Sequence, residues 1–374
     1  MRHSLKREFL KTRQHSKICE RIVVDMLDLL KKLCEIPAVS GREHELSAFI
    51  INEISPFCEY EKDNLRNIIA FKKGTETPKN KILLDAHMDE VGFIITAVTD
   101  EGYLLFDTVG GITPSVIFGS RVSIGGVKGV IAASPVHLLS IDERKKTVPI
   151  EKLTIDIGAV DREDALKYVQ PGNVAVFDCE FLEMGDGFIK SRALDDRVGC
   201  AILIDIIKKD LPFDMFFSFS VQEEVGLRGA RVAAFSVKPD IAIVVETTTA
   251  ADIPGVSHEK QVCRLGAGTA VSFMDGATVY DKELYDLAFS IAEKMNLPVQ
   301  PKAAVAGGNN SGSIHISAGG VRTAALSVPC RYLHSQSSVI NTADLLNTAA
   351  LVFEFAKEAP RDAARKNEVQ RTNP

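Results

Sequence analysis

The chain has 374 residues, of which 45% are hydrophobic and 25% charged, a composition typical of a globular protein with a large core in two domains or one elaborated domain. Its formal net charge of -6 leaves no surplus of basic side chains to neutralise phosphates, which disfavours a general nucleic-acid binder. No apolar run approaches the roughly 18 to 20 residues of a membrane span, so we expect no membrane partner.

The first 25 residues are basic and lack the apolar segment of a secretory signal. We interpret residues 1–25 as a disordered extension or an over-extended start before Met26, with an Arg-rich presequence as the alternative. The seven cysteines are scattered, odd in number and free of CxxC pairs. This pattern is typical of reduced thiols, and it predicts a cytoplasmic protein without disulfides or a thiolate zinc site.

Two amphipathic helices are predicted at the start of the fold, over residues 25–34 and 43–54, because leucine, isoleucine and phenylalanine recur there at helical spacing. The breaker Ile-Pro-Ala-Val-Ser-Gly at 36–41 separates them. A strand over 68–71 and a loop at 74–81 follow.

The next stretch, residues 81–90, reads Lys-Ile-Leu-Leu-Asp-Ala-His-Met-Asp-Glu and organises the rest of the chain. Its continuous apolar run predicts a parallel strand that is covered on both faces. In open α/β sheets, ligand sites form beyond the C-terminal ends of such strands. Here that end carries His87 and Asp89.

Between residues 91 and 186 the pattern changes to short β-prone runs separated by glycines, with one helical segment at 161–168. Such spacing predicts a small β-barrel or sandwich, and this segment carries few candidate catalytic side chains. We interpret it as an inserted domain.

An α/β pattern resumes at residue 187 and continues to 360. We expect strands over 215–222, 241–245 and 324–329, helices over 200–208, 282–295 and 342–357, and a glycine-rich loop at 306–312. The charged segment 361–374 lacks apolar periodicity and is predicted to be a disordered tail. The predicted fold class is therefore α/β: a mixed, largely parallel sheet flanked by helices, formed by residues 26–90 and 187–360, with the β-rich insertion at 91–186.

Three later strands are also followed by ionisable side chains. These are Glu223 and Glu224 after the first strand, Glu246 after the second, and His334 shortly after the third. On a regular strand Glu223 and Glu224 would point to opposite faces, so both reach one site only if the chain turns there. Two histidines with several carboxylates and no cysteine suit two divalent ions, zinc, cobalt or manganese, in a hydrolytic site.

A site for two metal ions needs a carboxylate that bridges both ions and a base beside the attacking water. Asp195 is the candidate bridge, and Glu224 and Glu246 are candidate terminal ligands. Glu223 is left over as a general base that takes a proton from the metal-activated water and passes it to a leaving amine. Asp89, two residues after the first histidine, is a candidate to fix the tautomer of that ring.

Five motifs, in this order, resemble those of the M42 metallo-aminopeptidases, which include glutamyl aminopeptidases, TET peptidases and proteins labelled endoglucanase M. The motifs are Ala-His-Met-Asp-Glu-Val-Gly at 86–92, Ala-Leu-Asp-Asp-Arg-Val-Gly at 193–199, Gln-Glu-Glu-Val-Gly-Leu-Arg-Gly-Ala at 222–230, Ala-Asp-Ile-Pro-Gly at 251–255 and Pro-Cys-Arg-Tyr-Leu-His-Ser at 329–335. The resemblance spans almost all of residues 26–357. It implies a zinc-exopeptidase-like fold and a metal-dependent aminopeptidase that releases N-terminal residues from peptides.

The resemblance also implies roles for single residues. It assigns one ion to His87, Asp195 and Glu246, the other to Asp195, Glu224 and His334, the general base to Glu223, and the orientation of the first histidine to Asp89. A cis peptide between Asp195 and Asp196 is typical of related two-metal peptidases. The insertion is implied to be a dimerisation domain whose dimers build a homo-oligomer, a hollow dodecamer.

Two features depart from the family pattern. Aspartate is usual where this chain has Glu246, which favours an altered metal preference over loss of the metal. The loop at 307–312 has Asn309 and Asn310 in place of the usual Thr-Asp, which removes a negative charge near the expected substrate end.

Two other functions stay open at this point. A glycoside hydrolase would agree with the endoglucanase label, but it requires no histidines beside its two carboxylates, and this chain has no Trp and only six Tyr to stack on sugar rings. A catalytically weak, metal-stabilised assembly protein would keep every proposed ligand.

Overall fold

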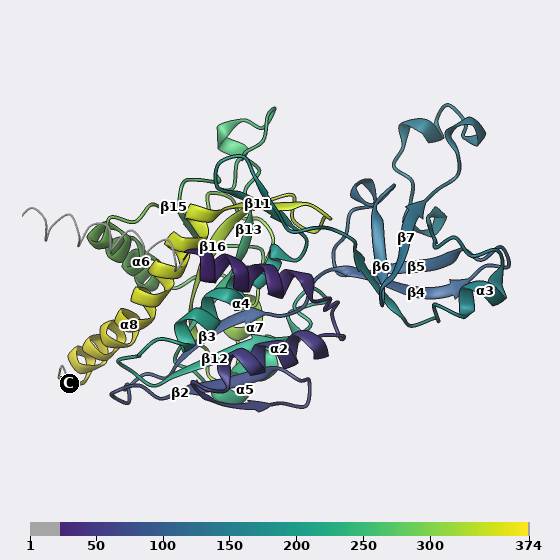
Figure 1. Cartoon of the computed structure of the whole chain (residues 1–374). Coiled ribbons are helices and arrows are strands. Elements are labelled where there is room, and N and C mark those ends of the chain that lie inside the picture. Colours follow the sequence, from purple (N-terminus) through teal and green to yellow (C-terminus); the bar gives the residue numbers. More distant parts are fainter. Residues whose placement is uncertain (1–22, 373–374) are drawn as a thin grey trace, which may run out of the picture.

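The structure, a computed structural model, describes residues 23–372 and the side chains up to residue 361. The N-terminal extension predicted for residues 1–25 therefore lies almost wholly outside the described residues. The larger domain is a sheet with helices, and a separate barrel stands at its side (Figure 1). Within the described part of the chain, no helix is both long and apolar enough to cross a membrane.

Four parallel strands form the centre of the large sheet. They lie in the order β12 (Met215–Ser220), β3 (Ile82–His87), β13 (Ile241–Thr249) and β16 (Arg322–Arg331). Strand β3 is buried along its whole length, as expected for a parallel strand covered on both faces. His87 lies on β3 and Glu246 on β13, whereas Glu223 and Glu224 follow β12 and His334 follows β16.

Further strands extend the sheet on both sides and make it mixed. Beyond β12 lie β2 (Ile68–Lys72) and β1 (Glu59–Lys62), and beyond β16 lie β17 (Ser338–Asn341), β11 (Phe188–Ser191) and β10 (Leu182–Met184). Strand β14 (Thr269–Val271) pairs with β16 and with β15 (Val299–Pro301).

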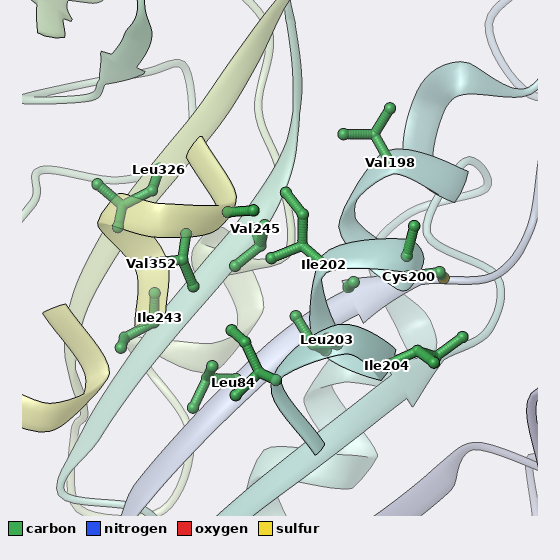
Figure 2. Packing of buried hydrophobic residues seen from close by; sticks show 14 of the residues in the cluster. Leu84, Val198, Cys200, Ile202, Leu203, Ile204, Ile243, Val245, Leu326 and Val352 are labelled. Atoms are coloured by element: carbon green, nitrogen blue, oxygen red, sulfur yellow. The ribbon is translucent and has the colours of Figure 1, made fainter. Parts of the chain in front are cut away.

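Helices bury both faces of the central strands. On one face lie a helix over 23–35, α2 (His44–Ile54), α4 (Leu194–Ile207), α6 (Lys282–Met295) and α8 (Thr342–Thr372). Figure 2 shows this core, where Leu84, Ile243 and Val245 of the strands face Ile202 of α4 and Val352 of α8.

The opposite face packs against a smaller cluster. Alternate residues of the same strands, such as Leu83 and Val244, contact α5 (Arg228–Val237) and α7 (Ser311–Ile314) there. Because consecutive side chains of a strand point to opposite faces, the unbroken apolar runs in the sequence serve both cores at once.

The insertion forms a closed barrel of six antiparallel strands, as predicted. The strands are β4 (Gly92–Val98), β5 (Leu104–Val109), β6 (Arg121–Ile124), β7 (Val127–Ala132), β8 (Thr154–Asp156) and β9 (Val174–Phe177), in the order β4-β5-β8-β7-β6-β9. The barrel has a core of its own, in which the ring of Phe93 meets Phe106 and Phe177 edge to face. The predicted helical segment is α3 (Arg162–Leu166), capped by the side chain of Asp161.

Short 3-10 turns lie in the loops that connect the strands. They are η1 (Pro114–Val116), η2 (Val136–Leu138), η3 (Glu143–Lys145), η4 (Ile150–Lys152) and η5 (His258–Lys260).

Helix α8 is longer than the predicted helix at 342–357. Its backbone stays helical through Pro360 to Thr372, so residues 361–372 differ from the disordered tail that we expected. Alanine, arginine, lysine, glutamate and glutamine predominate in that stretch, and these residues favour a helix even without an apolar face.

Candidate metal centre

The first histidine of the site is the last residue of the buried strand β3. The side chain of His87 is 3% exposed, and its Nδ1 lies 3.1 Å from the main-chain oxygen of Asp89 and 3.5 Å from the Oδ1 of the same residue. Since a carbonyl oxygen only accepts, Nδ1 of the neutral ring carries the proton and the lone pair lies on Nε2. That Nε2 faces Oδ1 of Asp195 at 3.3 Å.

Asp195 lies between the two histidines of the site. Its Oδ1 faces Nε2 of His87, and its Oδ2 lies 3.5 Å from Nε2 of His334. The residue is placed by an irregular start of α4, where Ala193 has φ 54° and the predicted cis peptide joins Asp195 to Asp196. One carboxylate thus contacts both imidazoles, as a bridging ligand must.

The chain turns sharply where β12 ends, and this turn directs two neighbouring glutamates. Gln222 has φ 56°, and the amide groups of Gly226 and Leu227 donate to the carbonyl of Glu223 at 2.9 Å. Because the chain turns here, the rule that consecutive side chains of a strand point to opposite faces does not apply to Glu223 and Glu224. Oε2 of Glu224 lies 3.2 Å from Nε2 of His334.

Asp89 does more in the structure than the sequence predicted. Its carboxylate accepts hydrogen bonds from the main-chain N–H of Glu223 at 2.9 Å and of Glu224 at 3.1 Å, and from Oγ of Ser40 at 2.6 Å. The residue therefore ties the end of β3, where His87 lies, to the turn after β12.

Glu246 lies within β13 and not at its end, and it is 7% exposed. Its Oε1 accepts a hydrogen bond from Nδ2 of Asn309 at 2.8 Å. Among the described residues, one group offers three ligand atoms that all lie within 4.8 Å of one another, and it consists of His87, Asp195 and Glu224. His334 contacts this group, whereas Glu246 lies outside it.

The electrostatics of the site favour a cation. Burial opposes a charge on His334, but Asp195 and Glu224 outweigh it and raise the pKa of this imidazole to about 9. Burial and repulsion between neighbouring carboxylates raise the pKa values of Glu223, Glu224 and Glu246. The two histidines hold the pKa of Asp195 below its usual range, although burial works in the opposite direction.

These residues fit a divalent ion. Imidazole nitrogens and carboxylate oxygens are ligands of zinc, cobalt and manganese. In addition, Oε1 of Glu224 is buried and has no hydrogen-bond partner among the described residues. A bound cation would satisfy that oxygen and relieve the repulsion between the carboxylates.

A buried ion-pair cluster beside the site was not predicted from the sequence. Glu90 accepts hydrogen bonds from Arg192, from Arg197 at 3.1 Å and from the main-chain N–H of Ala38 at 3.0 Å. A glutamate directly after Asp89, at the end of a strand predicted to be buried, was the signal that could have indicated it.

Asn310 has a partner that the sequence did not predict. Its Nδ2 donates to Oδ2 of Asp85 at 2.7 Å and to Oγ of Ser220 at 2.9 Å. The available signal was the single carboxylate within the apolar strand Ile82–His87.

Comparisons with known proteins agree with the geometry and the motifs. The sequence model of the family described as M42 glutamyl aminopeptidase matches residues 66–351. A putative aminopeptidase of Acetivibrio thermocellus is 42% identical over 333 residues, which cover 88% of this chain and 98% of that protein.

Two solved structures are similar over most of their length. An aminopeptidase from the archaeon Desulfurococcus kamchatkensis has a TM-score of 0.86 and 32% identity, covering 91% of this chain and 96% of its own. The TET1 peptidase of Pyrococcus horikoshii has a TM-score of 0.78 and 35% identity, covering 89% of this chain and 99% of its own. The fold class and the family resemblance derived from the sequence are confirmed. The chain therefore belongs to the M42 glutamyl aminopeptidase family and is an aminopeptidase, a metal-dependent hydrolase.

Proposed function

We propose that the chain releases N-terminal residues from peptides at a centre for two divalent ions, zinc or cobalt first and manganese as the alternative. The position of Asp195 carries the proposal, because its two carboxylate oxygens face Nε2 of His87 and Nε2 of His334. A carboxylate between two imidazoles, surrounded by further carboxylates, is the donor arrangement that dinuclear hydrolytic sites use.

Each ion would have three protein ligands. By the family resemblance, His87, Asp195 and Glu246 would hold one ion, and Asp195, Glu224 and His334 would hold the other. In the second set, Nε2 of His334 contacts both carboxylates. When bound, such ions polarise the carbonyl of the scissile bond and lower the pKa of the attacking water. Asn309 donates to Oε1 of Glu246, which leaves Oε2 of that carboxylate for an ion.

Glu223 is the proposed general base, and it would return the proton to the leaving amine. Burial raises its pKa to about 8, with the neighbouring carboxylates acting in the same direction and His87 against them. A carboxylate with a raised pKa accepts a proton more readily than an ordinary one and can still release it near neutral pH. The hydrogen bond from its N–H to Asp89 fixes the turn that places it.

The test is hydrolysis of acidic, basic, aliphatic and aromatic aminoacyl-anilides by chelator-stripped protein, before and after addition of zinc, cobalt or manganese. Metal-restored release of one residue class would support the proposal. Protein that rebinds about two ions per chain and cleaves no anilide would contradict it.

The variant Glu223→Gln should keep its metal content and lose about 10²- to 10⁴-fold in turnover. Unchanged turnover would remove Glu223 as the base.

We also propose that the chain assembles through its barrel, residues 91–186, into dimers and then a dodecamer. Apolar side chains are exposed there: Phe118 at 59%, Val136 at 63%, Leu138 at 69% and Ile141 at 72%. Exposed apolar patches on a globular protein mark interaction surfaces. The Pyrococcus horikoshii TET1 peptidase is described as able to assemble into a tetrahedron or a large octahedral shell. A native mass measurement tests this, and a monomer would contradict it.

A further inference from the structure

A turn of the inserted barrel reaches the metal centre of the other domain. It follows β5, where Gly110 has φ 86° and its carbonyl accepts a hydrogen bond from the N–H of Ile112 at 3.1 Å. The carbonyl of the next residue, Gly111, accepts a hydrogen bond from Nδ1 of His334 at 2.8 Å. A loop of the barrel thus contacts a side chain 223 positions further along the chain.

The surroundings of His334 enclose its ring less than those of His87 enclose the other ring. It lies on a loop after β16, its backbone has φ 57°, and its side chain is 35% exposed, against 3% for His87. A non-glycine residue in the left-handed region persists only when its surroundings hold it there. The ring of His334 is thus less enclosed than that of His87, and its orientation depends on its polar contacts.

The Gly111 carbonyl also selects the tautomer of His334. Because the carbonyl only accepts, Nδ1 of the neutral ring keeps its proton and the lone pair lies on Nε2. That atom faces Oε2 of Glu224 at 3.2 Å and Oδ2 of Asp195 at 3.5 Å. The other histidine is oriented differently, by the main-chain oxygen of Asp89 at the end of its own strand.

Gly110 brings the turn close to a second member of the site. A Cβ atom at this position would lie 2.8 Å from Cγ1 of Val91 and 3.3 Å from Cβ of Glu224. The positive φ and the close approach together require glycine. Ile112, which is 7% exposed, anchors the turn in the barrel core.

We propose that the barrel turn at residues 110–112 is a positioning element of the metal centre. Gly111 orients His334, Gly110 limits the space beside Glu224, and the barrel thereby contributes to the affinity for the ion that these two side chains hold. The inference rests on the proposed two-metal centre. Loss of the partner that orients a metal-binding histidine typically weakens metal binding 10- to 100-fold.

Two variants and two matched controls test this role. Gly110→Ala disturbs the turn directly, and its control is Gly119→Ala, where φ is 77° but a Cβ atom would meet nothing within 4 Å. Ile112→Ala loosens the anchor of the turn, and its control is Ile131→Ala, a fully buried residue of the same barrel core on β7. Zinc and cobalt titrations of metal-free protein measure the affinity for each ion.

We expect Gly110→Ala and Ile112→Ala to bind one ion about 10- to 100-fold more weakly and the other ion normally. Both controls should bind two ions as the wild type does. Wild-type affinity for both ions in the turn variants would overturn the proposal, as would equal weakening in the turn variants and their controls. Ile112→Val, a smaller truncation, covers the case in which Ile112→Ala does not fold, and it should weaken the same ion.

The same titrations separate this inference from the proposed function. Wild-type protein that binds two ions and cleaves no anilide would contradict the proposed reaction and leave the role of the turn standing. Cleavage by the wild type together with normal metal binding by all the variants would support the proposed reaction and contradict the role of the turn.

Discussion

The side-chain amide of Asn309 donates to Oε1 of Glu246, and both residues differ from those that the family resemblance implies at their positions. The same Nδ2 donates to the hydroxyl of Tyr280 at 2.9 Å, and that hydroxyl donates to Asp275. The two departures therefore form a single contact. The side chain of Glu246, one methylene longer than aspartate, accepts from the Asn309 amide, which also donates to the hydroxyl of Tyr280.

Asn309→Ala should lower the affinity of the site for divalent ions, because Glu246 loses the donor that orients its carboxylate. We expect a roughly 10- to 100-fold increase in the dissociation constant of one ion, measured by zinc titration of metal-free protein. Tyr280→Phe is the comparison, since it removes the second partner of the amide and keeps the bond to Glu246. Equal effects of both variants would contradict the specific role of Asn309.

Asp89→Asn should lower kcat/KM while leaving metal content near that of the wild type. Both carboxylate oxygens accept from main-chain N–H groups of the turn that holds Glu223 and Glu224, and an amide group would present a donor to one of them. We expect a loss of about 10- to 100-fold in anilide hydrolysis. Ser40→Ala removes one donor to Asp89 and leaves the turn bonds, so its effect should be smaller. Unchanged kcat/KM in Asp89→Asn would contradict this role.

Glu90→Ala should destabilise the fold strongly. The side chain of Glu90 is 4% exposed, and its removal leaves the guanidinium groups of Arg192 and Arg197 buried, at 6% and 0% exposure, without their carboxylate. Breaking a buried ion pair in this way costs about 3 to 5 kcal/mol in the free energy of unfolding. Glu53→Ala is the control, because its ion pair with Lys208 is about one-third exposed and is worth at most about 1 kcal/mol. Urea denaturation measures both values, and equal losses would contradict the prediction.

The contribution of Asp344 to the free energy of unfolding should fall as the pH rises from about 4 to about 6. Burial raises its pKa to about 6, although the N–H groups of Gly266 and Gly268 donate to its carboxylate. The folded chain then binds this proton more tightly than the unfolded chain does. The stabilising contribution is therefore full below the unfolded pKa and is lost as pH rises through the folded pKa.

The pKa difference of roughly two units for Asp344 corresponds to at most about 3 kcal/mol. Asp344→Asn should remove this part of the pH dependence, and urea denaturation at several pH values measures it. The slope between pH 4 and pH 6, not the absolute stability, is the quantity to compare. An identical slope in the variant would contradict the assignment to this carboxyl group.

The sequence alone was sufficient to predict the fold class, and it also indicated which strand ends carry the candidate site residues. Residues 81–90 show why: an apolar run predicts a buried parallel strand, and parallel strands end at one edge of a sheet. The positions of His87, Glu224, Glu246 and His334 on neighbouring strands or just beyond them followed from this rule. The short β-prone runs separated by glycines also predicted the barrel, because strand and turn preferences are local properties of the sequence.

Only the tertiary structure decided which polar groups meet. The bond from His334 to Gly111, the bond from Asn309 to Glu246 and the contacts of Glu90 with two arginines all join residues far apart in the chain. Hydropathy and periodicity report which face of an element is buried, and they do not report which donor lies opposite which acceptor. That pairing depends on the angles at which the chain turns, as at Gln222, where a left-handed residue bends the chain and the N–H groups of Glu223 and Glu224 both donate to Asp89.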